Sequence, residues 1–171
     1  GNFGSLFFLP KIYIMNVKET IQKLLLEKFQ EPDFQDCYIV ELKEFVGKRI
    51  EVYVDSDTGL DIRKCQQINR HLGILWETNP AIGEKYDLEV SSPGISRPLQ
   101  MPRQYIKNVG RNLKVLKKDG SESVGLLKAA SNDGVLEYLT KKKKKKKTIK
   151  NIVEENIDYN NIQTATIKLA F

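Results

Sequence analysis

The sequence predicts an α+β protein with two domains, an N-terminal α-β-β-α-β domain around a three-stranded sheet and a C-terminal small β-barrel. Apolar residues recur at helical spacing and then at alternating spacing through the first half, which is typical of helices that cover a sheet. Five short alternating stretches separated by turn residues fill the second half. The net charge also changes, from −4 over residues 15–98 to +9 over residues 99–171, which favours two separate units.

The composition of the 171-residue chain is that of a folded globular protein, with 40% hydrophobic and 29% charged residues. Cys37 and Cys65 lack metal-ligand spacing, and the single His71 completes no cluster with them. We therefore expect two thiols that pack as small apolar side chains, rather than a disulfide or a zinc site, and a reducing, cytoplasmic compartment. No metal and no cofactor are expected.

Residues 1–14 form a segment of their own at the N-terminus. Their apolar stretch Leu6–Leu9 lacks the basic lead-in and the small-residue cleavage site of a secretory signal, and it is too short to span a bilayer. Because Met15 directly precedes a helical pattern, we expect the natural protein to begin there. The preceding residues would then be an addition or the product of a misassigned start, and no membrane association is expected.

Two helices are expected in the first domain. Apolar residues recur at helical spacing from Val17 to Phe29, and Pro32 ends the pattern because it has no amide donor. Asp61 can cap the N-terminus of the second helix. The apolar face of this second helix is predicted to consist of Ile62, Cys65, Ile68, Leu72 and Leu75.

Three strands are expected beside these helices. The first runs from Cys37 to Phe45, and a tight turn at Gly47–Lys48 leads into the second, in which Ile50–Val54 alternates between apolar and polar residues. Strict alternation over Tyr86–Val90 predicts the third strand. On the first strand, one face is predicted to hold Tyr38, Val40 and Leu42.

The second half favours a barrel of the SH3-like or Sm-like type, because a sandwich usually needs about seven strands. Hairpin turns are predicted at Asp119–Gly120 and Asn132–Gly134, and a brief turn at Asn160–Ile162 precedes the closing strand. The five predicted strands cover Leu113–Leu116, Val124–Leu127, Val135–Leu139, Thr148–Val153 and Ala165–Leu169.

A distinctive motif, Ser-Ser-Pro-Gly-Ile-Ser-Arg-Pro-Leu, follows the third strand at residues 91–99. Pro93 followed by Gly94 favours a type II turn, because proline fixes φ and glycine accepts the positive φ that comes next. Together with Leu88–Val90, this motif closely resembles the signature of the ribosome maturation factor RimP family. The resemblance extends over nearly the whole chain from about Val17 and also includes Val54, Asp55, Gly59, Cys65, Val109–Arg111, Gly125–Leu127 and Ile162–Leu169.

The resemblance implies an N-terminal α/β domain, a C-terminal SH3-like barrel and binding to the immature small ribosomal subunit. It further implies that the barrel associates with a small-subunit ribosomal protein of the decoding region, near ribosomal RNA, and that no chemistry is performed. Two features depart from the family. Arg63 and Lys64 stand where its members commonly carry acidic residues, and a run of seven lysines lies in the barrel. The charge contacts of the family are therefore not carried over.

The motif is interpreted first as a fixed interdomain elbow and second as a contact surface. We expect an N-terminal domain over residues 15–92, a linker over residues 93–100 and the barrel over residues 101–171. A rigid elbow could still place two weak binding surfaces on one particle. The residues of this candidate site are Ser92, Pro93, Gly94, Arg97 and Pro98.

The lysine run is a candidate RNA contact, because lysines that neutralise phosphates release counterions and bind with little sequence specificity. The alternative is a solvated loop between two strands. Tyr138 and Tyr159 could stack on RNA bases, although strand aromatics more often fill the wall of a small barrel. The run consists of Lys141, Lys142, Lys143, Lys144, Lys145, Lys146 and Lys147.

Catalytic motifs are lacking in the sequence, so no catalytic residue is predicted. His71 is expected on the outer face of the second helix and has no nucleophile at motif spacing. The aspartates at 55, 57 and 61 lack the final glutamate of a calcium loop. A phosphate-binding loop, a dinucleotide fingerprint and a nucleophile elbow are also missing. A metal-dependent enzyme thus has no support in the sequence.

Two hypotheses of function follow. The first is an assembly factor, monomeric when free, that recognises both protein and RNA on the immature small subunit. The second is a stand-alone, nonspecific RNA-binding module that uses the barrel and the lysine run. The first predicts that binding survives neutralisation of the lysines, and the second predicts that it collapses.

Overall fold

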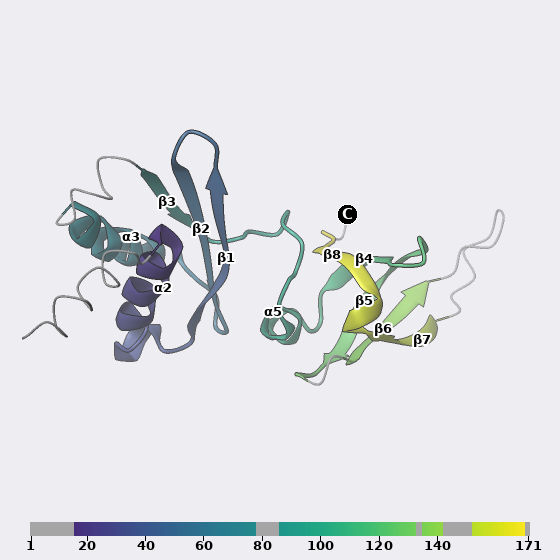
Figure 1. The fold of residues 1–171 in the computed structure, drawn as a ribbon. Helices are drawn as coiled ribbons and strands as arrows, with labels where there is room; N and C mark the ends of the chain where they lie inside the picture. The colour runs from purple at the N-terminus through teal and green to yellow at the C-terminus, as the bar shows by residue number, and fades with distance from the viewer. Residues whose placement is uncertain (1–15, 78–85, 133–134, 142–151, 170–171) are drawn as a thin grey trace, which may run out of the picture. The chain divides into compact units, whose positions relative to one another are not determined.

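The computed structural model describes residues 16–77, 86–132, 135–141 and 152–169. The chain divides into two compact units, residues 1–92 and residues 93–171 (Figure 1). The predicted N-terminal segment over residues 1–14 lies outside the described residues. Within the described ranges, the helices are all too short or too polar to cross a membrane.

Each helix of the first unit begins at a polar residue, of which only Asp61 was predicted as a cap. The side chain of Asn16 accepts a hydrogen bond from the Glu19 amide (2.8 Å) and caps α2 (Val17–Lys28), which is followed by the short 3-10 helix η1 (Pro32–Phe34). The Asp61 carboxylate accepts a hydrogen bond from the Lys64 amide (2.7 Å) at the start of α3 (Ile62–Glu77). The predicted cap of the second helix is thus confirmed.

The three predicted strands of the first unit form one sheet in the order β1-β2-β3. These strands are β1 (Cys37–Phe45), β2 (Arg49–Ser56) and β3 (Asp87–Ser91). β1 and β2 pair antiparallel through a turn in which Gly47 and Lys48 have φ values of 97° and 63°, whereas β3 pairs parallel to β2. The α-β-β-α-β order is therefore confirmed.

The predicted face of β1 is wrong because the strand contains a bulge. Ile39 pairs with Val54 and Glu41 pairs with Tyr53, so Val40 is an extra residue without a counterpart on β2. The alternation reverses across this bulge. Leu42 therefore shares the core side with Ile39, whereas Tyr38 lies on the opposite face of the sheet.

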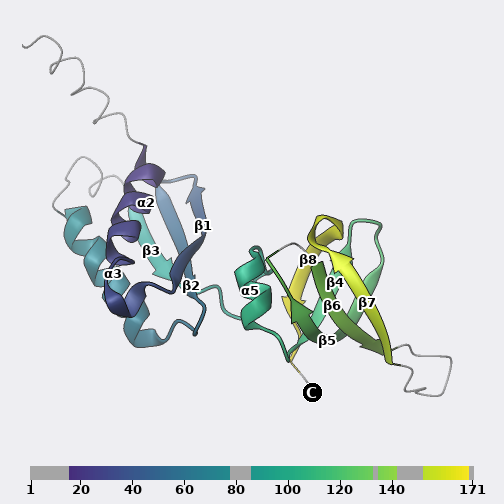
Figure 2. The ribbon, with the colours of Figure 1, turned by 90° about the horizontal axis from the view of Figure 1, so that it is seen from below.

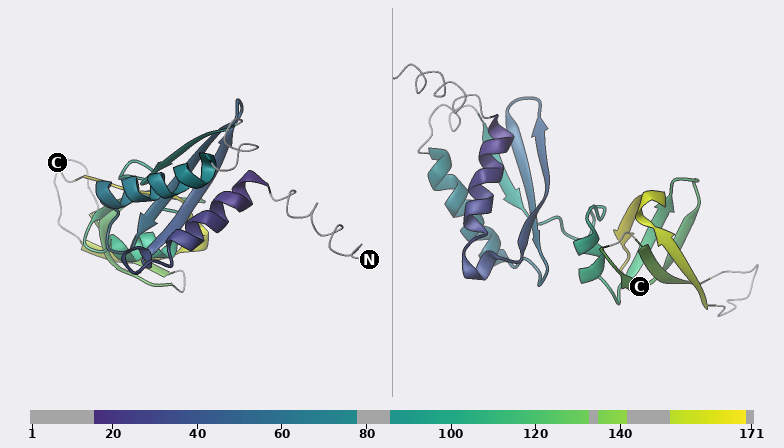
Figure 3. Two further views of the ribbon diagram at one scale, coloured as in Figure 1. Left: turned by 90° about the vertical axis from the view of Figure 1, so that its left-hand side faces the viewer. Right: turned by 60° about the horizontal axis from the view of Figure 1, so that its bottom comes forward.

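The core of the first unit lies between the sheet and its helices. α2 and α3 cover the same face of the sheet (Figures 2 and 3). β2 supplies Ile50, Val52 and Val54, which are completely buried there. The remaining buried members are Ile21, Leu25, Phe29, Phe34, Cys37, Ile68, Leu72 and Val90.

The side chain of His71 differs from its predicted exposed position. It is half-buried, and its buried Nε2 atom has no hydrogen-bond partner among the described residues. His71 lies three residues after Ile68 and one before Leu72, so it occupies the flank of α3 next to the buried face rather than the outer face. Cys37 is buried and Cys65 is half-buried, and the two are not joined by a disulfide.

The second unit contains a short helix and a five-stranded antiparallel sheet in the order β7-β6-β5-β4-β8. The helix α5 (Pro102–Lys107) was not predicted. A 3-10 helix, η2 (Tyr159–Asn161), occupies the predicted turn before the last strand. The strands are β4 (Asn112–Lys117), β5 (Glu122–Ala130), β6 (Val135–Lys141), β7 (Ile152–Asp158) and β8 (Ile162–Ile167).

The five predicted strands correspond to these elements, with shifts at the last two. β7 continues to Asp158, and β8 begins at Ile162 and ends before Leu169, which is exposed. Among the described residues, the strand pairings do not join β7 to β8, so the strands form an open sheet. Its buried core consists of Leu99, Tyr105, Leu113, Val115, Leu127, Ile157 and Ala165.

Candidate functional site

The segment with the Ser-Ser-Pro-Gly motif follows the end of β3, which hydrogen bonds from α3 hold in place. The Val90 carbonyl accepts hydrogen bonds from the Asn69 side-chain amide (3.2 Å) and from the Cys65 thiol (3.8 Å), both on α3. Val90 itself is buried in the core. Burial raises the pKa of the Cys65 thiol, so this donor remains protonated at neutral pH.

Within the motif, Gly94 has a φ of 66°, the left-handed conformation that glycine was predicted to supply. Pro93 is buried, whereas Ser92 and Pro98 are exposed. Arg97 is half-buried and has an interaction partner. The five predicted residues therefore lie along one segment with a turn at residues 94–96, and they do not form a cluster of reactive groups.

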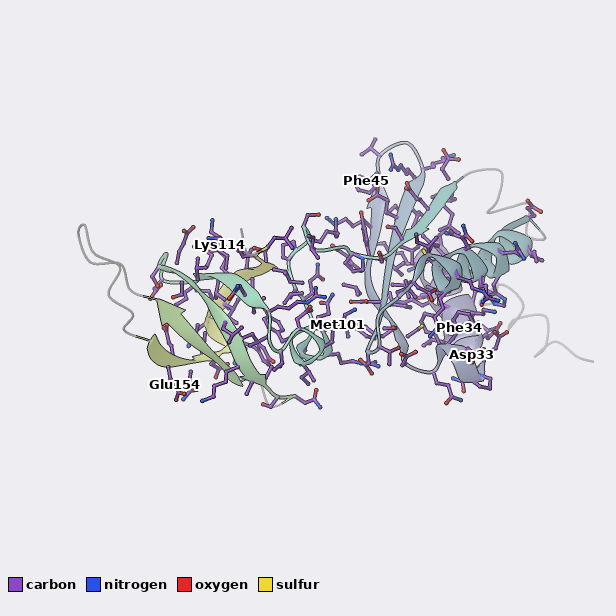
Figure 4. The ribbon with its side chains drawn as sticks, turned by 180° about the vertical axis from the view of Figure 1, so that it is seen from behind. Asp33, Phe34, Phe45, Met101, Lys114 and Glu154 are labelled. Carbon is purple, nitrogen blue, oxygen red and sulfur yellow. The ribbon has the colours of Figure 1, made fainter. Side chains whose placement is uncertain are left out.

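The other end of the segment is anchored within the second unit. The Leu99 amide donates a hydrogen bond to the Ala165 carbonyl of β8 (2.8 Å), and the Leu99 side chain enters the core. The Gln104 side-chain oxygen accepts hydrogen bonds from the Gln100 amide (2.7 Å) and the Met101 amide (3.0 Å) at the start of α5 (Figure 4). Because Gln104 is only 1% exposed, these bonds are shielded from water.

A second buried amide completes this arrangement at the end of α5. The Asn108 side chain donates a hydrogen bond to the Gln104 carbonyl (2.6 Å), and the Asn108 backbone amide donates to the Tyr105 carbonyl (3.0 Å). Asn108 is 4% exposed. These bonds satisfy carbonyls that the end of a six-residue helix leaves without an intrahelical donor.

Two tyrosines pack together where α5 meets η2. The rings of Tyr105 and Tyr159 have centroids 4.9 Å apart at an angle of 50°. The Tyr105 hydroxyl donates to the Leu99 carbonyl (3.5 Å), and the Tyr159 hydroxyl donates to the Ser131 carbonyl (3.0 Å). Burial, with a smaller effect of Tyr159, raises the pKa of Tyr105 to about 12, and burial also raises the pKa of Tyr159. Both hydroxyls therefore stay protonated at neutral pH.

These elements surround an open pocket of about 470 Å³ in the second unit. Its walls contain no charged side chain, and they combine aromatic and aliphatic surface with a few amides and a hydroxyl. Such a lining suits the binding of an uncharged or apolar group and lacks the paired base and nucleophile of a catalytic site. The lining residues are Pro98, Leu99, Gln100, Pro102, Tyr105, Tyr159, Ile162, Gln163 and Thr164.

The pocket includes Pro98 from the predicted motif, but the sequence reasoning missed most of its other residues. Pro102 at the first position of α5 and Gln104 at the third position were available signals for a short helix. Tyr159 was considered as a base-stacking or wall residue, and it packs against Tyr105 as part of the wall. Leu99 and Ala165 are brought together only by the fold.

The lysine run contributes one described residue, Lys141, the last residue of β6, whose backbone pairs with Ile152 of β7. Lys142 to Lys147 lie outside the described residues, as do the side chains of Trp76 and Tyr138. Within the described part of the chain, histidine, cysteine, aspartate and glutamate form no group of three or more that could hold a metal ion.

The fold and the site together define a two-unit α+β protein with an uncharged binding pocket next to the segment that joins its units. The RimP N-terminal domain family model matches residues 25–96. The ribosome maturation factor RimP of Cytophaga hutchinsonii is 37% identical over 144 residues, which cover 81% of this chain and 82% of that relative. The chain belongs to the ribosome maturation factor RimP family.

Two further relatives extend the likeness over more of the chain. The ribosome maturation factor RimP of Flavobacterium psychrophilum is 30% identical over 163 residues, covering 92% of this chain and all of the relative. The same factor of Christiangramia forsetii is 29% identical over 157 residues, covering 91% of this chain and 99% of the relative. Membership in this family places the protein in ribosome maturation.

Proposed function

We propose that this protein binds the immature small ribosomal subunit in the cytoplasm and assists its assembly without catalysing a reaction. In this role the second unit binds a small-subunit ribosomal protein of the decoding region, close to ribosomal RNA. The protein acts as a monomer and needs no cofactor or metal.

The uncharged pocket is the observation that carries this proposal. Tyr105 and Tyr159 supply rigid amphipathic surface, and tyrosine is enriched at protein interfaces because it buries a large area at a small entropic cost. Gln100 and Gln163 add hydrogen-bonding groups that can fix the orientation of a bound protein segment. A pocket without charge favours a protein segment over the phosphate backbone of RNA.

The segment over residues 93–100 is proposed as a fixed elbow between domains at residues 15–92 and 101–171. Support comes from its anchored ends, at Val90 in the first unit and at Leu99 in the second, and from the left-handed turn at Gly94. The second domain is further proposed to be a small barrel of the SH3-like or Sm-like type. Its five antiparallel strands and the 3-10 helix before β8 support that class.

Co-sedimentation with immature and mature small subunits across a salt series tests the proposed function. The natural chain is compared with a Tyr159→Ala variant and with a variant in which Lys141 to Lys147 are changed to Ser. We expect preferential binding to immature particles by the natural chain and by the serine variant, and about a tenfold loss for Tyr159→Ala. Ile106→Ala, an exposed position on α5 outside the pocket lining, is the control.

A stand-alone RNA-binding module is the second candidate, favoured by the net charge of +9 over residues 99–171. Seven of these charges come from the lysine run, so its removal leaves only +2. Equal binding to every RNA-containing particle, abolished by the serine substitutions, would establish this candidate and exclude assembly recognition.

A further inference from the structure

The outward face of α3 carries two arginines on one line of the helix. Ile68 and Leu72 are completely buried on the core side, and Arg63 and Arg70 lie on the opposite side of the helix, where both are exposed. Seven residues correspond to nearly two full turns, so the two side chains project in the same direction about 10 Å apart along the axis. Figure 3 shows α3 lying across the sheet with its far side turned away from the strands.

The described residues offer no ion-pair partner to either of these two guanidinium groups. Among the described residues, ion pairs within 4.0 Å do not involve Arg63 or Arg70, whereas neighbouring Lys64 lies 3.9 Å from Asp36. The aspartate at the helix start, Asp61, is occupied as the cap. An arginine stays charged at any physiological pH, so the outer face of α3 keeps two uncompensated positive charges.

On the face of the sheet that α3 does not cover, the charged side chains are paired with one another. Glu51 and Glu89 are paired in register there on neighbouring strands, and Arg49 contacts both carboxylates at 2.7 and 2.9 Å. The Tyr53 hydroxyl donates to the other oxygen of Glu51 (2.6 Å). Arg49 is thus shared between two carboxylates on this face, where Lys43 also lies opposite Glu51, whereas Arg63 and Arg70 on α3 have no ion pair among the described residues.

Polar side chains that suit a sugar-phosphate backbone lie between the two arginines. Gln66 and Gln67 are exposed on the same side of α3, and glutamine is a common partner of phosphate and sugar oxygens. Arginine itself presents a planar fork that matches phosphate in two-bond contacts. Two exposed isoleucines flank these polar side chains, Ile62 next to Arg63 and Ile74 near the end of the helix, so the predicted place of Ile62 on the buried face is wrong.

We propose that the exposed face of α3 is an RNA-binding surface, on which Arg63 and Arg70 bind two backbone phosphates of ribosomal RNA. The choice of ribosomal RNA as the natural ligand rests on the proposed function, because that function brings the protein to an RNA-rich particle. The surface is separate from the pocket of the second unit and from the lysine run. It recognises backbone charge and shape rather than base sequence.

The test uses the full chain with Lys141 to Lys147 changed to Ser, so that the lysine run cannot mask the effect. Binding to a fluorescent double-helical RNA hairpin is measured by anisotropy over a salt series. The double variant Arg63→Gln and Arg70→Gln is expected to weaken binding about tenfold at low salt and to lower the slope of log affinity against log salt by about 1.5. Thermal melting checks that folding is unchanged, since both residues are exposed.

Two control variants separate a site from overall charge. Lys18→Gln with Lys23→Gln removes the same two charges from exposed positions on α2 and is expected to change the affinity less than twofold. Arg63→Lys with Arg70→Lys should keep the salt slope while losing part of the affinity, because lysine lacks the two-bond fork. An equal loss in the α2 control, or no loss in the α3 variant, would overturn the proposal.

A photo-crosslinking residue in place of Gln67 identifies the natural ligand on the immature subunit, with a residue in place of Lys23 as control. Crosslinks from position 67 to RNA support the proposal, and crosslinks to an acidic protein segment alone contradict it. If the chain does not co-sediment with the particle, the proposed function fails, and the hairpin measurement still decides whether α3 binds RNA. If the chain co-sediments and both α3 tests are negative, only the α3 surface is refuted.

Discussion

The two units of this protein organise their interiors by different means. In the first unit, two amphipathic helices cover one face of a sheet with an apolar core between them, and the buried polar residues Asp55 and Ser56 lie at the end of β2. In the second unit, the buried side chains of Gln104 and Asn108 fasten a one-and-a-half-turn helix to the chain around it. Apolar burial thus positions the first unit, whereas buried hydrogen bonds position the pocket of the second.

The difference bears on function, because a hydrogen bond fixes the relative orientation of the groups that it joins, whereas apolar packing restricts their orientation less. Gln104 holds the Gln100 and Met101 amides in one orientation, and these two residues connect Leu99 and Pro102 of the pocket lining. In the first unit, by contrast, the exposed surface of α3 is set simply by which side of the helix is buried.

The largest expected effect tests the apolar core of the first unit. Leu25→Ala on α2 removes a completely buried side chain and should lower the free energy of unfolding by about 2–5 kcal/mol. Because the units have separate cores, hydrogen exchange should accelerate in β1 to β3 and stay unchanged in β4 to β8. Leu26→Ala, at a neighbouring position that is 57% exposed, is the matched control. Equal acceleration in both units would show that their stabilities are coupled.

A somewhat smaller loss of stability is expected from the deprotonation of Tyr105 in alkaline solution. Its pKa is about 12 in the folded protein and near 10 in the unfolded chain, so the unfolded state loses this proton first as the pH rises. The stabilisation is therefore complete below pH 10 and should decline between about pH 10 and 12, by about 2–3 kcal/mol. Chemical denaturation of the natural chain and of the Tyr105→Phe variant at a series of pH values measures this decline in the free energy of unfolding. Identical pH profiles for both chains would contradict the assignment to Tyr105.

The next largest loss of stability is expected when the buried hydrogen bonds of Gln104 in the second unit are removed. Gln104→Ala leaves the Gln100 and Met101 amides without their acceptor and should lower the free energy of unfolding of this unit by about 1–3 kcal/mol. The first unit should be unaffected. Ile106→Ala, two residues further along α5 and 40% exposed, provides the comparison, and hydrogen exchange in β4 to β8 provides the measurement. A loss no larger than that of Ile106→Ala would show that the buried amide contributes no stability.

Much of the first unit could be predicted because its signals are local. The helical spacing that ends at Pro32, the Asp61 cap and the turn at Gly47–Lys48 each depend on residues a few positions apart. The bulge at Val40 escaped prediction, since an extra residue in one strand is defined only by the strand that it faces. The position of His71 was missed for a related reason, because the flank of α3 becomes buried only when the unit packs around it.

In the second unit, the alternation of residues predicted the strands but not the pocket. Its lining comes from two stretches that are distant in the sequence, residues 98–105 and 159–164, and the packing of Tyr105 on Tyr159 brings them together. The turn at Gly94 was foreseen because proline followed by glycine restricts the backbone by itself. The way in which both ends of that segment are held could not be foreseen, since their partners lie on other elements.

By itself, the sequence determined the two-unit α+β organisation, the order of the elements and membership in the RimP family, because periodicity, caps, turns and the 91–99 motif are properties of neighbouring residues. Only the tertiary structure decided the reversal of faces on β1, the hydrogen bonds that hold α5 through Gln104, and the pocket whose lining includes Tyr105 and Tyr159. It also decided that Arg63 and Arg70 lie exposed on α3 and form no ion pair with the residues that the structure describes. The physical reason is that burial and pairing depend on which distant segments meet, and this is fixed only when the core closes.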